Sequence, residues 1–353
     1  CCTLRVRFRA ALADKLRVSL LLQEREEAVS LSPVSGGSRF REYACTFVTE
    51  STVSWLFLIE DRESGEKLYY DRRGVSKTAR PELCFQHIPG FRTPDWAKGA
   101  VMYQIFVDRF RDGNSANDVD TDEYLYIGLP VQHIENWDEK PSAFDVGYFY
   151  GGDLSGVREK FAYLKDLGVE VIYFNPLFVS PSNHKYDTQD YEHIDPHLTV
   201  IAEDGGELLP AEAGDNLNAT RYQKRSADPK NLEASDRFFA AFTEEAHRFG
   251  FRILLDGVFN HCGSFHKWLD REKIYAREGG YAPGAYLTPD SPYRKYFVFA
   301  DKRPEAWPDN KSYDGWWDND TLPKLNYEAS PELAEQILEV GEKWLKPPYQ
   351  VDG

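Results

Sequence analysis

The 353-residue sequence is poor in basic charge, in cysteine and in long apolar runs. Its 42 Lys and Arg against 58 Asp and Glu give a formal net charge of −16. This balance argues against a nucleic acid partner, because phosphate binding needs an excess of basic side chains. No run of about 18 apolar residues occurs, so no membrane-spanning helix is expected.

The five cysteines are odd in number and show no spacing typical of a metal site. A sequence without a disulfide framework favours a reducing compartment. No signal peptide is recognised, although Cys1-Cys2-Thr3-Leu4 is not a natural start. We therefore expect a cytoplasmic protein and keep secretion as the alternative.

Aromatic residues are abundant, at 14% of the chain, with 8 Trp, 21 Tyr and 22 Phe. Together with a hydrophobic content of 42% they suffice for a sizeable core. The length alone suggests about two domains. Rings that do not pack also offer flat apolar faces to ligands such as sugars.

The first 92 residues are expected to form short strands and no helices. The strand patterns are joined by Gly, Ser and Asp turns and cover residues 3–9, 16–22, 42–48, 53–60 and 67–71. Repeated short strands of this kind are typical of a β-sandwich. Residues 92–96 have the composition of a linker.

From residue 93 onward, buried strands alternate with amphipathic helices. Strands are expected at 101–107, 169–176 and 251–259, and helices are expected to end at Gly168, Gly250 and Trp344. The alternation implies a parallel sheet, and the long polar loops after each strand favour a (β/α)8 TIM barrel of the α/β class. About three βα units are present, with residues 260–328 as a small lobe after the third strand.

Polar side chains gather where the second and third of these strands end. Asp256 lies near the end of one strand, with Asn260 and His261 following it, while His184 and Tyr186 lie in the loop after the other. These residues are candidates for a sugar-binding site, since a tyrosine can stack under a pyranose ring. The alternatives are a satisfied polar cluster capping the barrel and an ordinary aromatic plug in a loop.

A third polar segment combines oxygen donors suited to Ca²⁺. Four of them fall within seven residues, and two more follow at the start of the first helix: Asp112, Asn114, Asn117, Asp118, Gly151 and Asp153. Asn, Asp and Gly also form ordinary turns, so that alternative stays open.

Together, five segments resemble the α-amylase family, glycoside hydrolase family 13. They are G-G-D-L-S-G-V (151–157), I-Y-F-N-P (172–176), H-K-Y-D-T-Q-D-Y (184–191), D-G-V-F-N-H (256–261) and L-P-K-L-N (322–326). The last resembles the form found in neopullulanases, cyclomaltodextrinases and maltogenic amylases. The resemblance covers residues 93–353 strongly and 1–92 weakly, where it implies a carbohydrate-binding-module-like domain.

The resemblance implies retaining hydrolysis of α-glucosidic bonds in starch, pullulan, maltodextrins or cyclodextrins. Asp256 would hold an active-site Arg and support the catalytic carboxylates, and the sugar would contact His184, Tyr186, Asn260 and His261. The six oxygen donors named above would bind Ca²⁺, although Asp112 and Asn114 stand in the reverse of the usual order. The subgroup also implies a homodimer formed through the N-terminal domain.

The resemblance places the Asp nucleophile and the Glu acid/base beyond residue 353, so residues 1–353 alone are expected to be inactive. A catalytically silent, glucan-binding or scaffold relative is the alternative, and an unrelated barrel enzyme is a third. The acidic insertion at about 200–227 is interpreted as a surface loop or a partner contact.

Overall fold

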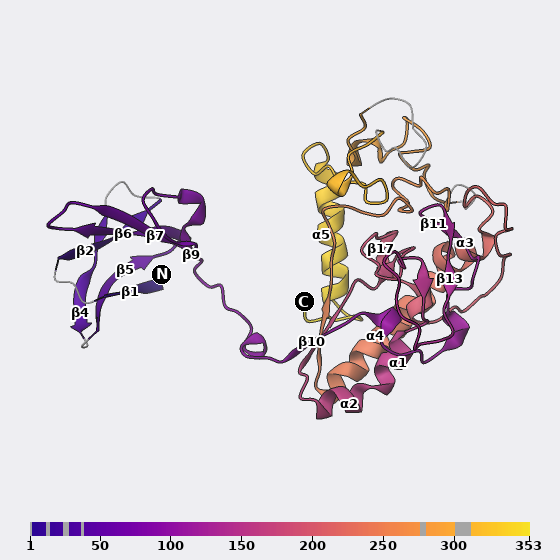
Figure 1. Ribbon diagram of the computed structural model, residues 1–353, viewed down its shortest axis with the longest axis horizontal. Helices are drawn as coiled ribbons and strands as arrows, with labels where there is room; N and C mark the ends of the chain where they lie inside the picture. Colours follow the sequence, from indigo (N-terminus) through magenta and orange to yellow (C-terminus); the bar gives the residue numbers. More distant parts are fainter. Residues whose placement is uncertain (1, 12–14, 24–27, 37–38, 276–279, 301–311) are drawn as a thin grey trace. The chain divides into compact units, whose positions relative to one another are not determined.

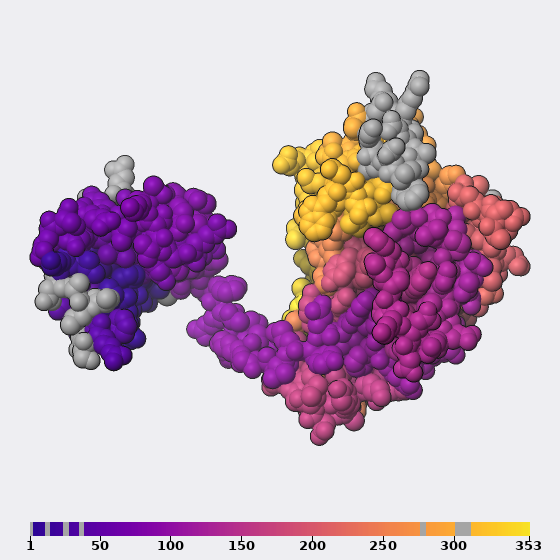
Figure 2. Space-filling view, viewed as in Figure 1, coloured from indigo at the N-terminus to yellow at the C-terminus, as the bar shows by residue number. Residues whose placement is uncertain are grey.

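The computed structural model describes residues 2–11, 15–23, 28–36, 39–275, 280–300 and 312–353. The chain divides into two compact units, Cys1–Lys98 and Gly99–Gly353 (Figure 1). The space-filling view in Figure 2 shows closely packed atoms within each unit. None of the helices in the described ranges is long and apolar enough to cross a membrane.

The first unit consists of two antiparallel sheets. One has the order β1-β5-β4, with β1 at Cys2–Ala11, β5 at Phe40–Thr49 and β4 at Ser32–Gly36. The other has the order β3-β2-β6-β7-β8, with β9 also paired to β6; its strands are β3 (Val29–Ser30), β2 (Leu16–Leu22), β6 (Val53–Asp61), β7 (Lys67–Asp71), β8 (Gly74–Ser76) and β9 (Phe85–His87).

Side chains from both sheets share one hydrophobic cluster. Val6 of β1 and Tyr43 of β5 belong to it together with Leu20 of β2. The rings of Phe8 and Phe57 approach to 4.8 Å between centroids. All five strand segments expected from the sequence lie within observed strands. A carbohydrate-binding role for this unit stays a prediction.

The second unit is built on a parallel sheet with the order β10-β15-β18. These strands are β10 (Met102–Ile105), β15 (Val171–Phe174) and β18 (Arg252–Leu255). Each is shorter than the sequence pattern predicts, because the hydrogen-bonded register covers only four residue pairs between neighbouring strands. The described residues form no closed barrel. The other strands of this unit pair in three two-stranded sheets: β11 (Leu125–Tyr126) with β12 (Leu129–Pro130), β13 (Gln132–His133) with β14 (Tyr148–Phe149), and β16 (Phe178–Val179) with β17 (Asp190–Ile194).

Helices pack against this sheet through aromatic residues. They are α1 (Leu154–Glu159), α2 (Phe161–Asp166), α4 (Pro229–Phe249) and α5 (Pro331–Leu345). The ring of Phe242 in α4 contacts Phe161 of α2 and Phe174 of β15, at 5.4 and 5.9 Å between centroids. The expected end of α4 is confirmed: Gly250 adopts a left-handed conformation with φ of 87°, which glycine reaches without steric cost.

The acidic insertion is more ordered than a surface loop. Its second half forms α3 (Thr220–Ala227), where Tyr222 and Arg225 are 1% and 4% exposed. Tyr222 belongs to a hydrophobic cluster with Tyr124 and Phe265. The interpretation of the segment as a surface loop is therefore wrong for residues 219–227, which form part of the interior.

Candidate active site

The carboxyl ends of β15 and β18 carry a polar cluster centred on Asp256. Its Oδ2 atom accepts hydrogen bonds from the hydroxyls of Tyr173 and Tyr186, at 2.6 and 3.0 Å. The hydrogen bond to Asp256 is the main reason why the pKa of Tyr173 rises to about 12. The structure thus brings two of the expected residues together and adds Tyr173, which sequence reasoning missed.

The register of the parallel sheet explains how Tyr173 reaches Asp256. Tyr173 of β15 lies opposite Leu254 of β18, and Asp256 follows two residues later. Because alternate strand residues point to the same face, Leu254 and Asp256 share the side on which Tyr173 lies. The tyrosine inside I-Y-F-N-P was therefore a usable sequence signal once the two strands were taken as neighbours.

The loop that carries His184 and Tyr186 is held by the residue between them. Lys185 has a backbone φ of 63°, a value that residues other than glycine rarely adopt. Its side chain is buried, at 3% exposed. Its Nζ donates to Asp195 Oδ2 at 2.7 Å and to the carbonyl of Ser180 at 2.9 Å. This buried ion pair turns Lys185 inward and leaves its two neighbours half-buried at the cluster.

The protonation state of His184 follows from its contacts. Its Nδ1 accepts the backbone N–H of Tyr186 at 3.1 Å, so a neutral ring carries its proton on Nε2. Burial lowers the pKa of His184, which favours this neutral form. His184 therefore presents an N–H donor, the group needed to hold a sugar hydroxyl.

His261 is buried and contacts the loop that carries Tyr186. Its Nε2 donates to the carbonyl of Tyr186 at 3.1 Å, and its Nδ1 lies 2.6 Å from the amide nitrogen of Asn260. Burial lowers the pKa of His261. Its ring also lies 5.9 Å from that of Trp316. The structure thus shows His261 in contact with Tyr186 and Asn260. Contact of His261 and of the exposed Asn260 with a sugar stays a prediction.

The predicted calcium residues meet around Asp153 at the start of α1. Asp153 Oδ1 accepts the backbone N–H groups of Gly113 and Gly156, at 3.1 and 2.6 Å. Its Oδ2 accepts from Asn117 Nδ2 at 3.2 Å. Asp118 lies against Gly151, where a Cβ atom would come within 2.5 Å of Asp118 Oδ1. Asp112 and Asn114 are half-buried and accept backbone N–H groups of their own turn.

Two oxygen atoms of this region are available to a cation. Among the described residues, Asn117 Oδ1 and Asp118 Oδ1 are buried without a hydrogen-bond partner. Burial and the neighbouring carboxylates of Asp112 and Asp153 raise the pKa of Asp118 to about 7. A cation would relieve this repulsion. The described residues hold no group of three or more His, Cys, Asp or Glu arranged as a metal site, so the donor set depends on amide and carbonyl oxygens as well.

A buried charge network joins Asp118, one of the predicted calcium residues, to the loop that carries His184 and Tyr186. It begins at Arg225, which donates to the carbonyl of Asp118 at 3.0 Å. His197 lies 3.0 Å from both Glu123 and Asp195, and Asp195 in turn binds Lys185. Arg225 of α3 donates to Glu123 at 2.9 Å. Burial alone would lower the pKa of His197, but the two carboxylates raise it to about 9. None of these contacts was visible in the sequence, because they join residues up to 107 positions apart.

Comparisons with known proteins identify the family of this chain. The family described as "Alpha amylase, catalytic domain" matches residues 104–205 and 234–353. Neopullulanase 2 of Thermoactinomyces vulgaris is 31% identical over 361 residues, covering 97% of this chain and 50% of the relative. Amylopullulanase of Thermoanaerobacter thermohydrosulfuricus is 38% identical over 252 residues, covering 66% of this chain and 14% of the relative.

Solved structures extend the likeness to both units. The type III pullulan hydrolase from Thermococcus kodakarensis has a TM-score of 0.56 at 25% identity, covering 99% of this chain and 52% of that one. The chain therefore spans about half the length of this structure and of neopullulanase 2. Since the family match covers more than half of the residues, the chain belongs to the α-amylase family.

Proposed function

We propose that the whole protein is a retaining glycoside hydrolase that cleaves α-glucosidic bonds in starch, pullulan, maltodextrins or cyclodextrins. The observation that carries the proposal is the carboxylate of Asp256, held by the hydroxyls of Tyr173 and Tyr186 where the strands end. Relatives named neopullulanase and cyclomaltodextrinase support the substrate class.

Each residue of the cluster has a distinct task in this proposal. Tyr186 offers its ring to a glucose unit and its hydroxyl to Asp256. His184 donates its Nε2–H to a sugar hydroxyl. Asp256, fixed in place by two hydroxyls, supports the pair of carboxyl groups that retaining enzymes use about 5–5.5 Å apart. That pair would be an Asp nucleophile and a Glu acid/base.

We also propose a bound Ca²⁺ at the residues around Asp153. Carbonyl and amide oxygens would supply part of its shell, because the carboxylates of Asp112, Asp118 and Asp153 do not form a metal site by themselves in the described part of the chain. When bound, the ion supplies positive charge that neutralises these carboxylates and ties residues 112–118 to the start of α1. The unpartnered oxygens of Asn117 and Asp118 support this proposal.

The substrate assay uses the full-length protein with pullulan, soluble starch and β-cyclodextrin, and measures new reducing ends. We expect release from at least one substrate. Tyr186→Ala should abolish most of it, whereas Tyr163→Ala, at an exposed position of α2, should not. A wild-type protein that releases no reducing ends from any substrate would refute hydrolysis and favour a catalytically silent glucan-binding protein or scaffold.

Location and assembly form a separate part of the proposal. We propose a cytoplasmic protein, supported by a Bacillus subtilis relative named intracellular maltogenic amylase, 31% identical over 265 residues. We also propose a homodimer formed through the N-terminal unit. Light scattering on the full-length protein and on a variant lacking residues 1–92 tests the assembly, and equal subunit numbers in both would contradict it.

A further inference from the structure

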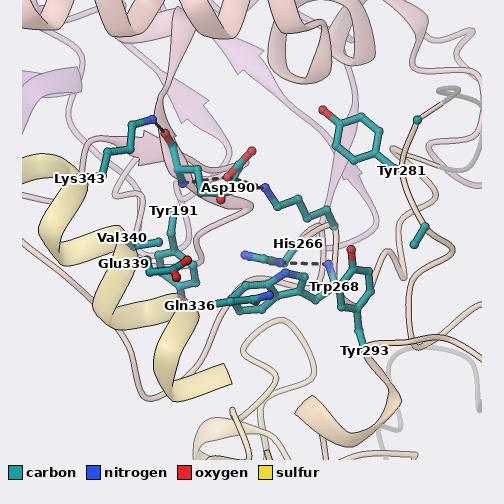
Figure 3. Close-up of a pocket in the computed structure, with 14 residues that line it drawn as sticks. Asp190, Tyr191, His266, Trp268, Tyr281, Tyr293, Gln336, Glu339, Val340 and Lys343 are labelled. Carbon is teal, nitrogen blue, oxygen red and sulfur yellow. Dashed lines mark hydrogen bonds and ion pairs between the residues drawn. The ribbon is translucent and has the colours of Figure 1, made fainter. Parts of the chain in front are cut away.

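Many aromatic rings of the second unit are buried and closed to a ligand. Figure 3 shows Tyr191 and Trp268 beside α5, and these residues are only 1% and 6% exposed. Trp317 differs, because it is 87% exposed. A tryptophan ring carries a large apolar surface, so one that is held in water at a defined position is available to a partner.

The loop that carries Trp317 is joined to the segment that follows β18. His261 and Lys324 pair in an isolated antiparallel bridge. The backbone N–H of Cys262 donates to the carbonyl of Pro323 at 3.1 Å. These contacts hold the loop beside His261, one of the residues predicted to contact a sugar.

The turn at Trp317 has a defined conformation. Trp317 and Asp318 have φ values of 53° and 58°, which residues other than glycine rarely adopt. The N–H of Trp316 donates to the carbonyl of Leu322 at 2.8 Å, and the N–H of Asn319 donates to the carbonyl of Trp316 at 3.0 Å. Such a conformation persists only where the surrounding contacts maintain it, so the ring is held in the solvent by the fold.

Three rings follow one another from the candidate site to the surface. The ring of His261 lies 5.9 Å from that of Trp316, and the ring of Trp316 lies 5.8 Å from that of Trp317. Along this row His261 is buried, Trp316 is half-buried and Trp317 is exposed. A chain of linked sugar units that leaves the candidate site along the row would therefore reach the ring of Trp317.

The surroundings of Trp317 suit a sugar better than an apolar protein surface. Its neighbours Asp314, Asp318 and Asn319 are exposed and polar. A protein partner that binds by apolar contact needs a wider apolar patch than one ring. A sugar unit has an apolar face that stacks on a ring and hydroxyl groups at its rim that pair with polar side chains.

We propose that Trp317 is a stacking platform for a glucosyl unit of an α-glucan that extends outward from the cluster around Asp256. The ring adds affinity for chains long enough to reach it, and shorter chains gain nothing from it. Trp317 thus determines the preference for chain length. The inference rests on the substrate class of the proposed function, but it concerns binding and not hydrolysis.

Calorimetric titration of maltoheptaose and of maltose into the full-length protein tests this role. Asp256→Asn serves as the background, because it should slow hydrolysis while the rings of Tyr186 and Trp317 remain. In this background Trp317→Ala should raise the dissociation constant for maltoheptaose about tenfold, the effect of losing one stacked ring. The constant for maltose should change less than about twofold on the same scale. Trp317→Phe, which keeps an aromatic face, should recover most of the lost affinity.

The matched control is Tyr163→Ala, which removes an exposed ring from α2 and should leave both dissociation constants unchanged. Equal maltoheptaose constants for Trp317→Ala and Tyr163→Ala would overturn the proposal. An equal loss of affinity for maltose and maltoheptaose would also overturn it, because the change would then act on the inner site.

Absence of maltoheptaose binding in the Asp256→Asn background would overturn the proposal as well. The melting temperature of Trp317→Ala should equal that of the background, since the lost ring is exposed. None of these results bears on hydrolysis, which the reducing-end assay measures separately on the wild-type protein. Failure of the platform and failure of the proposed function can therefore be told apart.

Discussion

Asp256 is held by two tyrosine hydroxyls, and this arrangement defines what each can contribute. Tyr186 lies in the loop after β15 and Tyr173 lies in β15 itself, so two different elements hold the carboxylate of Asp256. Loss of one hydroxyl should loosen Asp256 without removing the ring that a sugar would contact. A phenylalanine at position 186 therefore separates positioning from stacking.

We expect Tyr186→Phe in the full-length protein to lower kcat/KM on pullulan or cyclodextrin about tenfold to a hundredfold. Hydrogen bonds to charged groups contribute about 1.5–3 kcal/mol, and each 1.4 kcal/mol is a factor of about ten. Initial rates across a range of substrate concentrations provide the measurement. Tyr163→Phe on the surface of α2 is the control. Unchanged kinetics for Tyr186→Phe would show that its hydroxyl has no part in catalysis.

The buried His197 predicts how stability depends on pH. Its pKa in the folded protein is raised to about 9, above the value of about 6.5 expected when unfolded. Its stabilising contribution is thus complete below about pH 6.5 and is lost as the pH rises through about 9. The unfolding free energy of the 99–353 unit, measured by denaturant at fixed calcium, should fall over this range. His197→Gln should flatten that fall, and an equally steep decline in the variant would exclude His197 as the cause.

At the residue scale, the sequence predicted residues that follow strands better than it predicted buried ion pairs. Asp256 and Tyr186 could be found because they follow strands, where ligand-facing residues concentrate. Lys185, Asp195 and His197 were missed as a group. Their ion pairs depend on how distant loops pack, and no local periodicity encodes that packing.

At the scale of elements, patterns of apolar residues predicted the parallel strands and the ends of the helices. The predicted strands were too long, because apolar residues remain buried beyond the point where hydrogen bonding to the neighbouring strand stops. The helix expected to end at Gly168 is divided into α1 and α2 at Lys160, whose φ and ψ of −96° and 5° interrupt it. The polar helix α3 was missed, since its buried residues contact other loops and not the sheet.

Replacing two helical glycines by alanine should change the free energy of unfolding in opposite directions. A Cβ at Gly156 of α1 would lie 1.9 Å from the carbonyl oxygen of Arg111, whereas a Cβ at Gly341 of α5 would meet nothing within 4 Å. Gly156→Ala should therefore destabilise the 99–353 unit by about 1–3 kcal/mol, as overpacking does. Gly341→Ala should stabilise it by roughly 0.5–1 kcal/mol, because alanine favours helix.

Denaturant unfolding of the full-length variants, followed in the transition of the 99–353 unit, provides both values. Each variant is the control for the other, since both replace a helical glycine by alanine. Equal shifts of the same sign would contradict the close packing of residues 111–113 on α1.

At the scale of the whole molecule, the sequence predicted a change from short strands to alternating strands and helices, and the structure divides at Lys98. It also predicted that residues 112–118 and 151–153, far apart along the chain, act together. The structure brings Gly113 and Asn117 onto Asp153, while the expected metal itself remains a proposal. The test of that proposal is whether calcium stabilises the folded unit.

We expect saturating Ca²⁺ to raise the melting temperature of the 99–353 unit in the full-length protein, and a chelator to reverse the rise. A ligand at about 100 times its dissociation constant stabilises by about 2.7 kcal/mol, or roughly 5–10 °C for a unit of this size. Asp118→Asn should reduce this rise, because it removes a carboxylate whose Oδ1 atom has no hydrogen-bond partner among the described residues. Asp166→Asn, at an exposed position of α2, should keep it. A melting temperature indifferent to calcium and to chelator would show that the buried oxygens of Asn117 and Asp118 pair with something other than this cation.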